Sequence, residues 1–293
     1  MNDLIAEKST AVALGNFDGM HIGHRAVIDA TRVFGGRGLT PLVALFDVHS
    51  LQALDGSAPP MLILPEERDS LLSAAGVAAF EIGFSEIRDM SPEEFFESIL
   101  VKRLGAGAVV CGYNYRFGRG ASGDAEMLKR LCGRYSVECV TVPRVCVDGK
   151  TVSSTNIRKA VAGGDIKTAN KMLGRPFGFS AEVIHGDARG RELGFPTANQ
   201  LIPEKLIVPK FGVYSSTVTV DGDTFRGITN IGRRPTVGTD IVLSETHILD
   251  FDRDIYGSRM DVRLKSFLRP EIKFSSFNEL VKQINNDLKS TGS

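Results

Sequence analysis

The chain of 293 residues has few cysteines, no net charge and no long apolar run. None of the four cysteines, Cys111, Cys132, Cys139 and Cys146, belongs to a C-x-x-C pair, which disfavours zinc or a redox dithiol and predicts small buried side chains. A net charge of zero disfavours a nucleic-acid partner, because such proteins usually carry a basic excess. No segment is apolar over the length that spans a membrane, and the first ten residues do not resemble a signal peptide. We therefore expect a cytoplasmic protein that binds neither nucleic acid nor membrane.

The length favours two domains, and the first half alternates short apolar segments with helical ones. Strands are predicted at residues 11–14, 41–46, 108–111 and 137–142, and helices at 22–34, 66–75 and from a capping box at Ser91 to Gly105. Short apolar strands between helices are typical of a parallel sheet that is covered on both faces. The first half is therefore predicted to be an α/β domain.

The second half changes character after a predicted connecting helix at residues 165–173. Strands are predicted at residues 180–184, 213–220, 224–231, 242–251 and 260–267, with Asp221-Gly222 as a hairpin turn between two of them. This pattern indicates a small antiparallel β-barrel or sandwich. A terminal helix is expected to begin at Ser276, because the apolar residues after it recur on one helical face.

A glycine-bounded loop leads from the first strand into the first helix, which begins with His21-Ile-Gly-His24. The unpaired N–H groups of a helix start attract anions, and two imidazoles three residues apart lie on one face. They are suited to stabilise charge on an α-phosphate. Gly23 leaves space for a ligand to approach the backbone. The H-E-x-x-H spacing of zinc proteases is absent. The alternative is a surface helix that carries two histidines.

Hydroxyl groups also gather at a later helix start, in Val152-Ser-Ser-Thr-Asn-Ile-Arg158. Hydroxyls and a guanidinium suit the β- and γ-phosphates of ATP. An ordinary helix cap with a solvated arginine explains the same residues equally well.

The segment Cys111-Gly-Tyr-Asn-Tyr-Arg-Phe-Gly118 follows a predicted strand at the end where open sheets bind ligands. Asn114 offers both a donor and an acceptor to the edge of a ring. The aromatic residues around it suit stacking on a planar ligand, although packing under a glycine-rich loop is an alternative.

A second candidate site lies in Gly186-Asp-Ala-Arg-Gly-Arg-Glu-Leu-Gly-Phe-Pro-Thr-Ala-Asn199. Its glycines permit a tight path and its proline stiffens it, while two arginines are available to neutralise negative charge. Thr197 and Asn199 offer hard oxygen ligands of the kind that Mg²⁺ takes when it is bridged to phosphates. There is no Walker motif in the sequence, so an ATP phosphate would be held by a different loop.

Glu245 lies in a predicted strand and shares its face with Leu243 and His247. A carboxylate among partly apolar neighbours is placed to accept a proton from a hydroxyl group. The alternative is a partly exposed Glu–His pair on a strand.

These distant segments together resemble one family, the bacterial bifunctional riboflavin kinases/FMN adenylyltransferases, or FAD synthetases. The matching segments are GNFDGMHIGH, GYNYRFG, SSTNIR, GRELGFPTAN, NIGRRPT, ETHILDFDRDIYG and FLRPEIKF, in family order and over nearly the whole chain. H-x-G-H alone is weakly specific, whereas LGFPTAN followed by ETHILDF is highly specific for the kinase module.

The resemblance implies a Rossmann-like nucleotidyltransferase domain over residues 1–160, a connecting helix over 161–173, and a β-barrel riboflavin kinase domain with a terminal helix over 174–293. It implies phosphorylation of riboflavin by ATP to FMN, followed by adenylylation of FMN by ATP to FAD and pyrophosphate. Glu245 would be the base of the first reaction, and His21 and His24 would stabilise the transition state of the second. Mg²⁺ would be contacted by Thr197 and Asn199.

The implied nucleotide contacts come from both sites: Gly15, Asn16, Phe17, Asp18, Gly19, Gly23, Asn114, Ser153, Ser154, Thr155, Arg158, Arg189, Gly190, Arg191, Gly194, Pro196, Thr197 and Asn199.

Two departures from the family pattern bear on the adenylyltransferase. Many members carry F-D-P-H-P where this chain reads Phe46-Asp-Val-His-Ser50, and many have R-L-T where it reads Met61-Leu-Ile-Leu-Pro65. A riboflavin kinase with a weakened N-terminal module is therefore one alternative, and a flavin-binding sensor without turnover is another. The oligomeric state cannot be predicted from these patterns.

Overall fold

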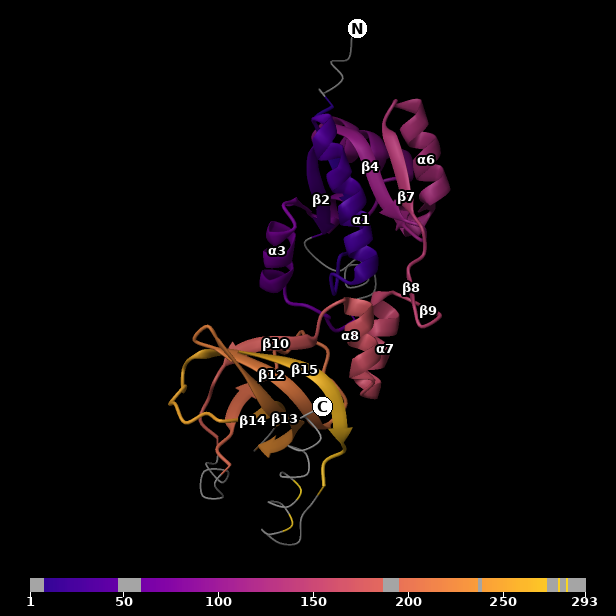
Figure 1. Ribbon diagram of the computed structural model, residues 1–293. Helices are drawn as coiled ribbons and strands as arrows, with labels where there is room; N and C mark the ends of the chain where they lie inside the picture. Colours follow the sequence, from indigo (N-terminus) through magenta and orange to yellow (C-terminus); the bar gives the residue numbers. More distant parts are fainter. Residues whose placement is uncertain are drawn as a thin grey trace. The chain divides into compact units, whose positions relative to one another are not determined.

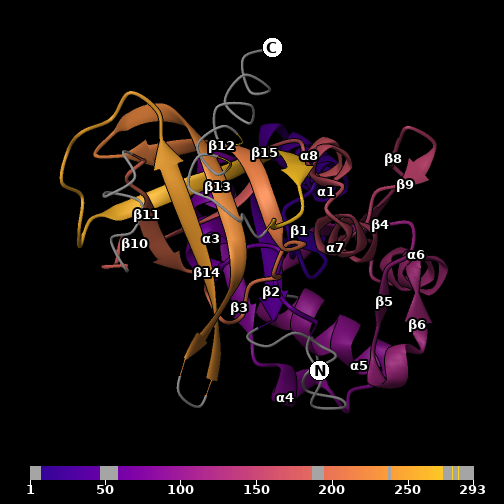
Figure 2. The same cartoon turned by 90° about the horizontal axis from the view of Figure 1, so that it is seen from below.

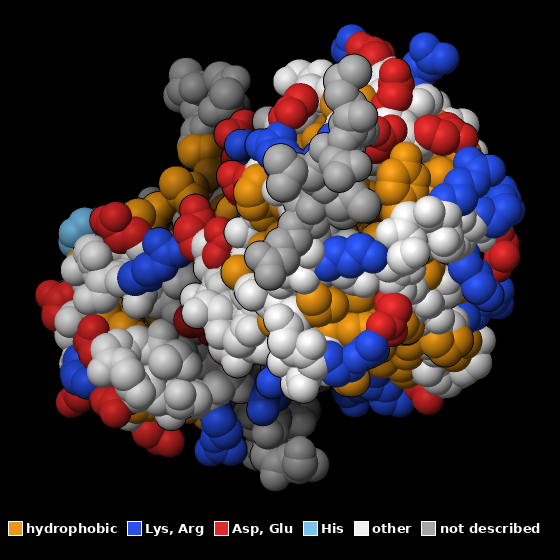
Figure 3. All heavy atoms as spheres, turned by 90° about the horizontal axis from the view of Figure 1, so that it is seen from above, with side chains coloured by type: hydrophobic (Ala, Val, Ile, Leu, Met, Phe, Trp, Pro, Cys, Tyr) orange, Lys and Arg blue, Asp and Glu red, His pale blue; other side chains and the backbone are white. Residues whose placement is uncertain are grey.

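The computed structural model describes residues 8–46, 59–186, 195–236 and 239–272, together with Glu279 and Gln283. The chain forms two compact units, Met1–Ser153 and Ser154–Ser293 (Figure 1). Within the described residues, no helix combines the length and the apolar character needed to cross a membrane. Basic and acidic side chains are interspersed on the face drawn in Figure 3, in line with the net charge of zero.

A five-stranded parallel sheet forms the centre of the first unit, with the strand order β3-β2-β1-β4-β7. Its strands are β1 (Thr10–Leu14), β2 (Thr40–Phe46), β3 (Ala78–Ile82), β4 (Ala106–Gly112) and β7 (Glu138–Val142). The prediction of a parallel α/β sheet is confirmed, and four of the strands were predicted. Strand β3 was not predicted: it is an edge strand whose side chains are mostly exposed, so it lacks the apolar run of a buried strand.

Helices cover both faces of this sheet. Successive strand residues point to opposite sides, so the apolar residues of each strand pack against helices on both faces. Ala11 and Ala13 pack against α1 (Ile22–Arg32) and α3 (Pro65–Ala74). Val12 and Leu14 pack on the other face, against the π-helix η2 (Phe95–Arg103) and α6 (Ala125–Arg134). The remaining elements are short: η1 (Val33–Arg37), α4 (Phe84–Ile87), α5 (Pro92–Glu94), β5 (Arg116–Phe117), η3 (Arg119–Ala121), β6 (Gly123–Asp124), β8 (Cys146–Val147) and β9 (Lys150–Thr151).

The helices of the first unit agree with the sequence in part. The capping box at Ser91 is present: its Oγ accepts from the N–H of Glu94, and the Glu94 carboxylate accepts from the N–H of Ser91. Helix α6 was not predicted, although Asp124 caps its start by accepting from Met127. The prediction of buried cysteines holds for Cys111 and Cys132, whereas Cys139 is half-buried and Cys146 is exposed. Cys146 lies on a two-residue strand of a short hairpin, outside both core clusters.

The second unit begins with two helices, α7 (Ser154–Gly163) and α8 (Ile166–Leu173), and continues as a six-stranded antiparallel sheet. The sheet has the order β10-β15-β12-β13-β14-β11 and curls into a half-barrel (Figure 2). Its strands are β10 (Phe177–Glu182), β11 (Ala198–Leu201), β12 (Gly212–Val220), β13 (Asp223–Thr236), β14 (Thr239–Ile248) and β15 (Arg259–Arg269).

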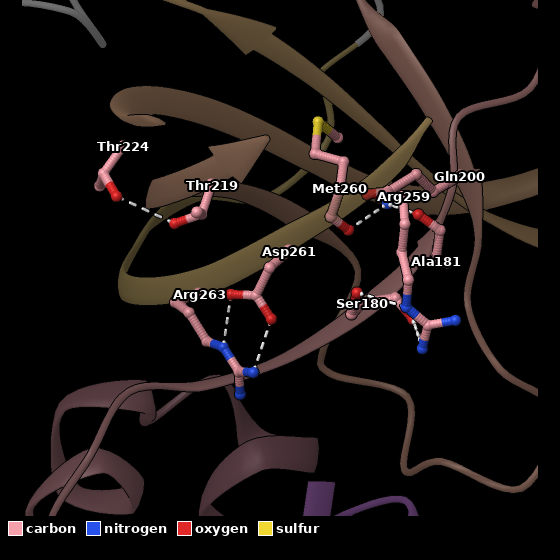
Figure 4. A network of polar contacts seen from close by, with 9 residues as sticks. All are labelled: Ser180, Ala181, Gln200, Thr219, Thr224, Arg259, Met260, Asp261 and Arg263. Atoms are coloured by element: carbon pink, nitrogen blue, oxygen red, sulfur yellow. Dashed lines mark hydrogen bonds and ion pairs between the residues drawn. The ribbon is translucent and has the colours of Figure 1, made fainter. Parts of the chain in front are cut away.

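The curl brings the two edges of this sheet together. An isolated antiparallel bridge joins Ile184, just after β10, to Asn199 on β11. The fully buried side chain of Gln200 then donates from Nε2 to the carbonyl oxygens of Ala181 and Met260, both at 2.7 Å (Figure 4). One amide thus ties β11 to β10 and β15, and it holds the edge strand that carries Asn199.

The antiparallel character of the second half is confirmed, with strands at all five predicted places. Asp221 and Gly222 form the predicted turn and both have positive φ, 51° and 86°. Strand β11 was missed, because its residues were assigned to the loop before it. Of the predicted terminal helix, only Glu279 and Gln283 lie within the described residues, and both are helical.

Gly178→Ala is expected to destabilise the second unit by roughly 1–3 kcal/mol, because overpacking of a buried strand pair costs about that much. A Cβ at Gly178 would overlap the carbonyl oxygen of Val262 and lie 2.9 Å from Cα of Arg263. The matched control is Gly163→Ala in α7, where a Cβ would meet nothing within 4 Å. Thermal unfolding should show a loss for the first variant and none for the second; equal midpoints would contradict this packing.

Candidate active sites

The strand order of the first sheet reverses at β1. From β1 the chain adds β2 and then β3 on one side, and later β4 and then β7 on the other. Open parallel sheets bind ligands outside the carboxyl ends of their strands at such a point. Because Leu14 pairs with Cys111, the loop after β1 and the segment after β4 emerge side by side at that edge.

The loop from Gly15 to His21 is tightly wound. Phe17 and Met20 both have positive φ, 49° and 42°, which is uncommon outside glycine and costly for bulky residues. The Phe17 ring folds back over Gly15, where a Cβ would lie 3.2 Å from it. Asp18 holds the loop from the side, since its carboxylate accepts from the N–H of Leu62 at 2.9 Å. Strain of this kind is typical of functional loops.

His21 and His24 form a stacked pair at the start of α1, with ring centroids 3.6 Å apart. His21 caps the helix: its Nδ1 accepts from the N–H of His24 at 3.1 Å, so Nε2 carries the hydrogen when the ring is neutral. A Cβ at Gly23 would lie 3.1 Å from the His21 ring. Gly23 therefore gives the His21 ring room to cap the helix, and its predicted contact with a nucleotide stays a prediction.

His24 is held in its neutral form. Burial lowers the pKa of His24 well below its usual value, and the neighbouring His21 lowers it further. Its Nδ1 is buried and has no hydrogen-bond partner in the described part of the chain. A neutral imidazole can donate a hydrogen bond to a phosphate without bringing a fixed charge into the site.

The depressed pKa of His24 predicts a pH-dependent stability. Below about pH 6.5, His24 is protonated in the unfolded chain but stays neutral in the folded one. The free energy of unfolding therefore decreases as the pH falls. We expect His24→Gln to lose less stability than the wild type between about pH 7 and about pH 5. Calorimetric unfolding of both proteins measures this; an unchanged difference between them at the two pH values would contradict it.

The other candidates for the adenylyltransferase lie in two places. Asn114 is exposed just beyond β4, at the edge where the loop after β1 emerges, and its Oδ1 would lie 3.5 Å from a Cβ at Gly112. Ser153 ends the first unit, whereas Ser154, Thr155 and Arg158 belong to the first turns of α7 in the second unit.

The second unit contains a cavity of about 470 Å³ at its β11 edge, within the size range of ligand pockets. Pro196, Thr197, Asn199 and Glu245 all line it. The structure thus brings together residues from two segments that the sequence singled out separately. The remaining lining residues are Val183, Gly186, Ala198, Arg234, Thr246, Ile248, Phe251, Asp252, Arg253, Asp254, Ile255 and Tyr256.

Strand pairing fixes the geometry of the polar residues in the cavity. Asn199 on β11 is the direct antiparallel partner of Glu245 on β14, so their side chains share a face. The Asn199 amide nitrogen donates to the carbonyl oxygen of Thr197 at 3.3 Å, which turns its Oδ1 away from that carbonyl. Gly186 makes room for this amide, since a Cβ there would lie 2.7 Å from the Cγ of Asn199.

The other neighbour of Glu245 is Asn230, its partner on β13. The amide nitrogen of Asn230 donates to Glu271 at 3.2 Å, while its Oδ1 is buried without a partner among the described residues. A Cβ at Gly232 would collide with the Glu271 carboxylate, so this glycine lets the carboxylate reach Asn230. Glu245 is therefore flanked on the sheet by an asparagine on each neighbouring strand.

A segment after β14 supplies much of the cavity wall. Arg253 donates to Asp223 at 2.9 Å and lies over the rings of Phe225 and Phe251, which fixes its guanidinium. Tyr256 stacks on His185 with centroids 3.8 Å apart. Sequence reasoning missed this wall as a site, although ETHILDFDRDIYG was among the segments that carried the family resemblance.

Four predicted nucleotide contacts, Arg189, Gly190, Arg191 and Gly194, lie outside the described residues, as do the Val48 and Ser50 departures. Among the described residues there is no cluster of three or more His, Cys, Asp or Glu side chains that would hold a metal alone. The cavity instead offers the oxygens of Thr197, Asn199 and nearby carboxylates. Such a set suits a cation that takes part of its ligands from phosphates.

Comparisons with known proteins match both units. Residues 4–156 match the family model for FAD synthetase, and residues 173–293 match the model for riboflavin kinase. Proteins named bifunctional riboflavin kinase/FMN adenylyltransferase are similar over 96% of this chain. The protein of Listeria monocytogenes is 38% identical, with 90% of its length covered, and that of Escherichia coli is 34% identical, with 91% covered.

A crystal structure described as a macrolide-efflux protein from Streptococcus pneumoniae has the same fold throughout. It superposes with a TM-score of 0.88 at 31% identity, and the match covers 98% of this chain and 95% of that one. Both family models and the relatives agree on one assignment, and their order along the chain is that of the two structural units. The chain belongs to the family of bifunctional riboflavin kinases/FMN adenylyltransferases.

Proposed function

We propose a division of labour between the two units of this enzyme. The chain phosphorylates riboflavin with ATP to give FMN, and it adenylylates FMN with ATP to give FAD and pyrophosphate. We assign the first reaction to the cavity of the second unit and the second reaction to the sheet edge of the first unit. One observation carries the assignment: Glu245, Asn199 and Thr197 line a single cavity, with Glu245 and Asn199 directly paired.

In the kinase reaction, the Glu245 carboxylate accepts the proton of the ribityl 5′-hydroxyl as that oxygen attacks the γ-phosphorus of ATP, and ADP leaves. Thr197 and Asn199 would hold the ATP phosphates and Mg²⁺, and Mg²⁺ would supply charge neutralisation when it is bound. Phosphoryl transfer needs little else from the protein than positioning and electrostatic stabilisation. The pairing of Asn199 with Glu245 across two strands fixes the positions of both residues.

In the adenylyltransferase reaction, a phosphate oxygen of FMN attacks the α-phosphorus of ATP and pyrophosphate leaves. His21 and His24 donate to the charge that develops on the α-phosphate, aided by the N-terminus of α1. The strained loop from Gly15 to Gly19 surrounds the nucleotide. Asn114 forms hydrogen bonds to the edge of a ring of the bound nucleotide. The proposed ligands of the departing phosphates are Ser153, Ser154, Thr155 and Arg158.

The finer features of the fold are also proposals. We propose that the first unit is a Rossmann-like nucleotidyltransferase domain over residues 1–160, joined by residues 161–173 to a β-barrel kinase domain with a terminal helix. The strand order of the first sheet supports the Rossmann-like assignment. The Ile184–Asn199 bridge supports the barrel, because it joins the two edges of the second sheet. A cytoplasmic location is proposed because ATP and free flavins are the substrates.

A chromatographic time course of riboflavin with Mg²⁺ and ATP tests the proposed function. We expect FMN to appear first and FAD to accumulate from it, and we expect a chelator to stop both steps. FMN without FAD would support the alternative of a kinase with an inactive first unit, which the FAD synthetase match disfavours. Absence of riboflavin-dependent ADP release would support the flavin-binding sensor.

A further inference from the structure

The segment that carries Thr197 is tied to β14 by the side chain of His247. Nδ1 of His247 lies 3.0 Å from the carbonyl oxygen of Pro196, and its ring meets that of Phe195 edge-on, with centroids 5.4 Å apart. Because a carbonyl oxygen can only accept, Nδ1 carries the hydrogen and donates it. His247 itself does not line the cavity.

This contact holds the chain just before the start of β11. The β11–β14 ladder pairs Ala198 with Thr246, so continuing it by one residue would place Thr197 opposite His247. The next residue, Pro196, has no N–H and cannot extend the ladder. Thr197 therefore lies between Ala198, which is held by backbone pairing to β14, and Pro196, which is held by the His247 side chain.

We propose that His247 is a positioning residue for phosphoryl transfer, which holds Pro196 and thereby places the Thr197 hydroxyl beside Glu245. Both Glu245 and His247 lie on one face of β14, so the strand that presents the base also sets the position of the phosphate-binding segment. The inference rests on the proposed function, because it takes the cavity as the kinase site.

Two amide variants separate the hydrogen bond from the bulk of the side chain. In His247→Asn the amide nitrogen takes the position of Nδ1, whereas in His247→Gln it lies one bond further out. His247→Phe keeps the ring that faces Phe195 but has no donor. Steady-state kinetics of riboflavin phosphorylation are measured with varied Mg²⁺–ATP and varied riboflavin, and FMN adenylylation is measured in the same proteins.

We expect the Gln and Phe variants to raise KM for Mg²⁺–ATP roughly 3- to 10-fold, the range of one hydrogen bond, and the Asn variant to stay within about twofold of the wild type. KM for riboflavin and the rate of FMN adenylylation should be unchanged. Equal values for Asn and Gln, or a fall in kcat with KM for Mg²⁺–ATP unchanged, would overturn the inference.

The proposed function can fail separately from this inference. If Glu245→Gln leaves riboflavin phosphorylation intact, the cavity is not the kinase site and the proposed function is wrong. If Glu245→Gln abolishes phosphorylation while all three His247 variants behave like the wild type, the kinase site stands and only the role of His247 is refuted. Thermal unfolding of each variant shows that the second unit is folded.

Discussion

Glu245→Gln should lower the rate of riboflavin phosphorylation by about 10²–10⁴-fold, the usual contribution of a general base, and leave the conversion of FMN to FAD unchanged. The amide keeps the shape of the carboxylate between Asn199 and Asn230, so the strand pairing stays intact. It cannot accept the proton of the attacking hydroxyl. Product analysis by chromatography, started once from riboflavin and once from FMN, separates the two activities.

The matched control is Glu182→Gln, which changes an exposed carboxylate of the same curled sheet that does not line the cavity. It should phosphorylate riboflavin like the wild type. If both variants lost activity equally, the loss would come from charge or folding rather than from the base. Loss of both activities in a folded Glu245→Gln protein would contradict two independent sites.

His24→Ala should have the reverse effect, lowering FMN adenylylation by about 10²–10³-fold, as is typical when one preorganised donor to a developing charge is removed. The variant removes a neutral imidazole that stacks on His21 at the start of α1. Phosphorylation of riboflavin should remain, so FMN accumulates. The same two product analyses measure this.

His21→Asn separates the helix cap from the chemistry of the pair. Asparagine is a strong N-cap residue, so its oxygen can accept from the N–H of His24 in place of Nδ1. The variant should therefore unfold at nearly the wild-type temperature yet lose adenylylation. If it kept full adenylylation, His21 would act only as a cap, and His24 would have to carry the stabilisation of the α-phosphate.

The parts of the fold that were predictable are those that local pattern determines. Strands β1 and β4 are buried on both faces, and their continuous apolar sequence predicts a parallel sheet. The Asp221-Gly222 turn follows from residues that tolerate positive φ. Strand β3 has exposed side chains, and β11 is a short edge strand held by its own Gln200, whose amide donates to β10 and β15 across the curled sheet. Such elements depend on tertiary contacts that no sequence window contains.

The candidate sites show the same limit. The residue types of Thr197, Asn199 and Glu245 pointed to phosphate, metal and base chemistry, but only the strand register shows that Asn199 and Glu245 face each other. The role of His21 as a cap, and the need for glycine at Gly23, depend on a ring position that spacing does not reveal. Long-range pairing, rather than composition, decides which residues share a site.

A crystal structure of the chain with Mg²⁺, ADP and FMN tests the kinase assignment most directly. The account predicts the ADP phosphates at Thr197 and Asn199, with the ester oxygen of FMN within about 3 Å of the Glu245 carboxylate, the reach of a general base. Nucleotide and flavin bound elsewhere in the second unit, with the cavity beside Glu245 empty of both, would contradict it.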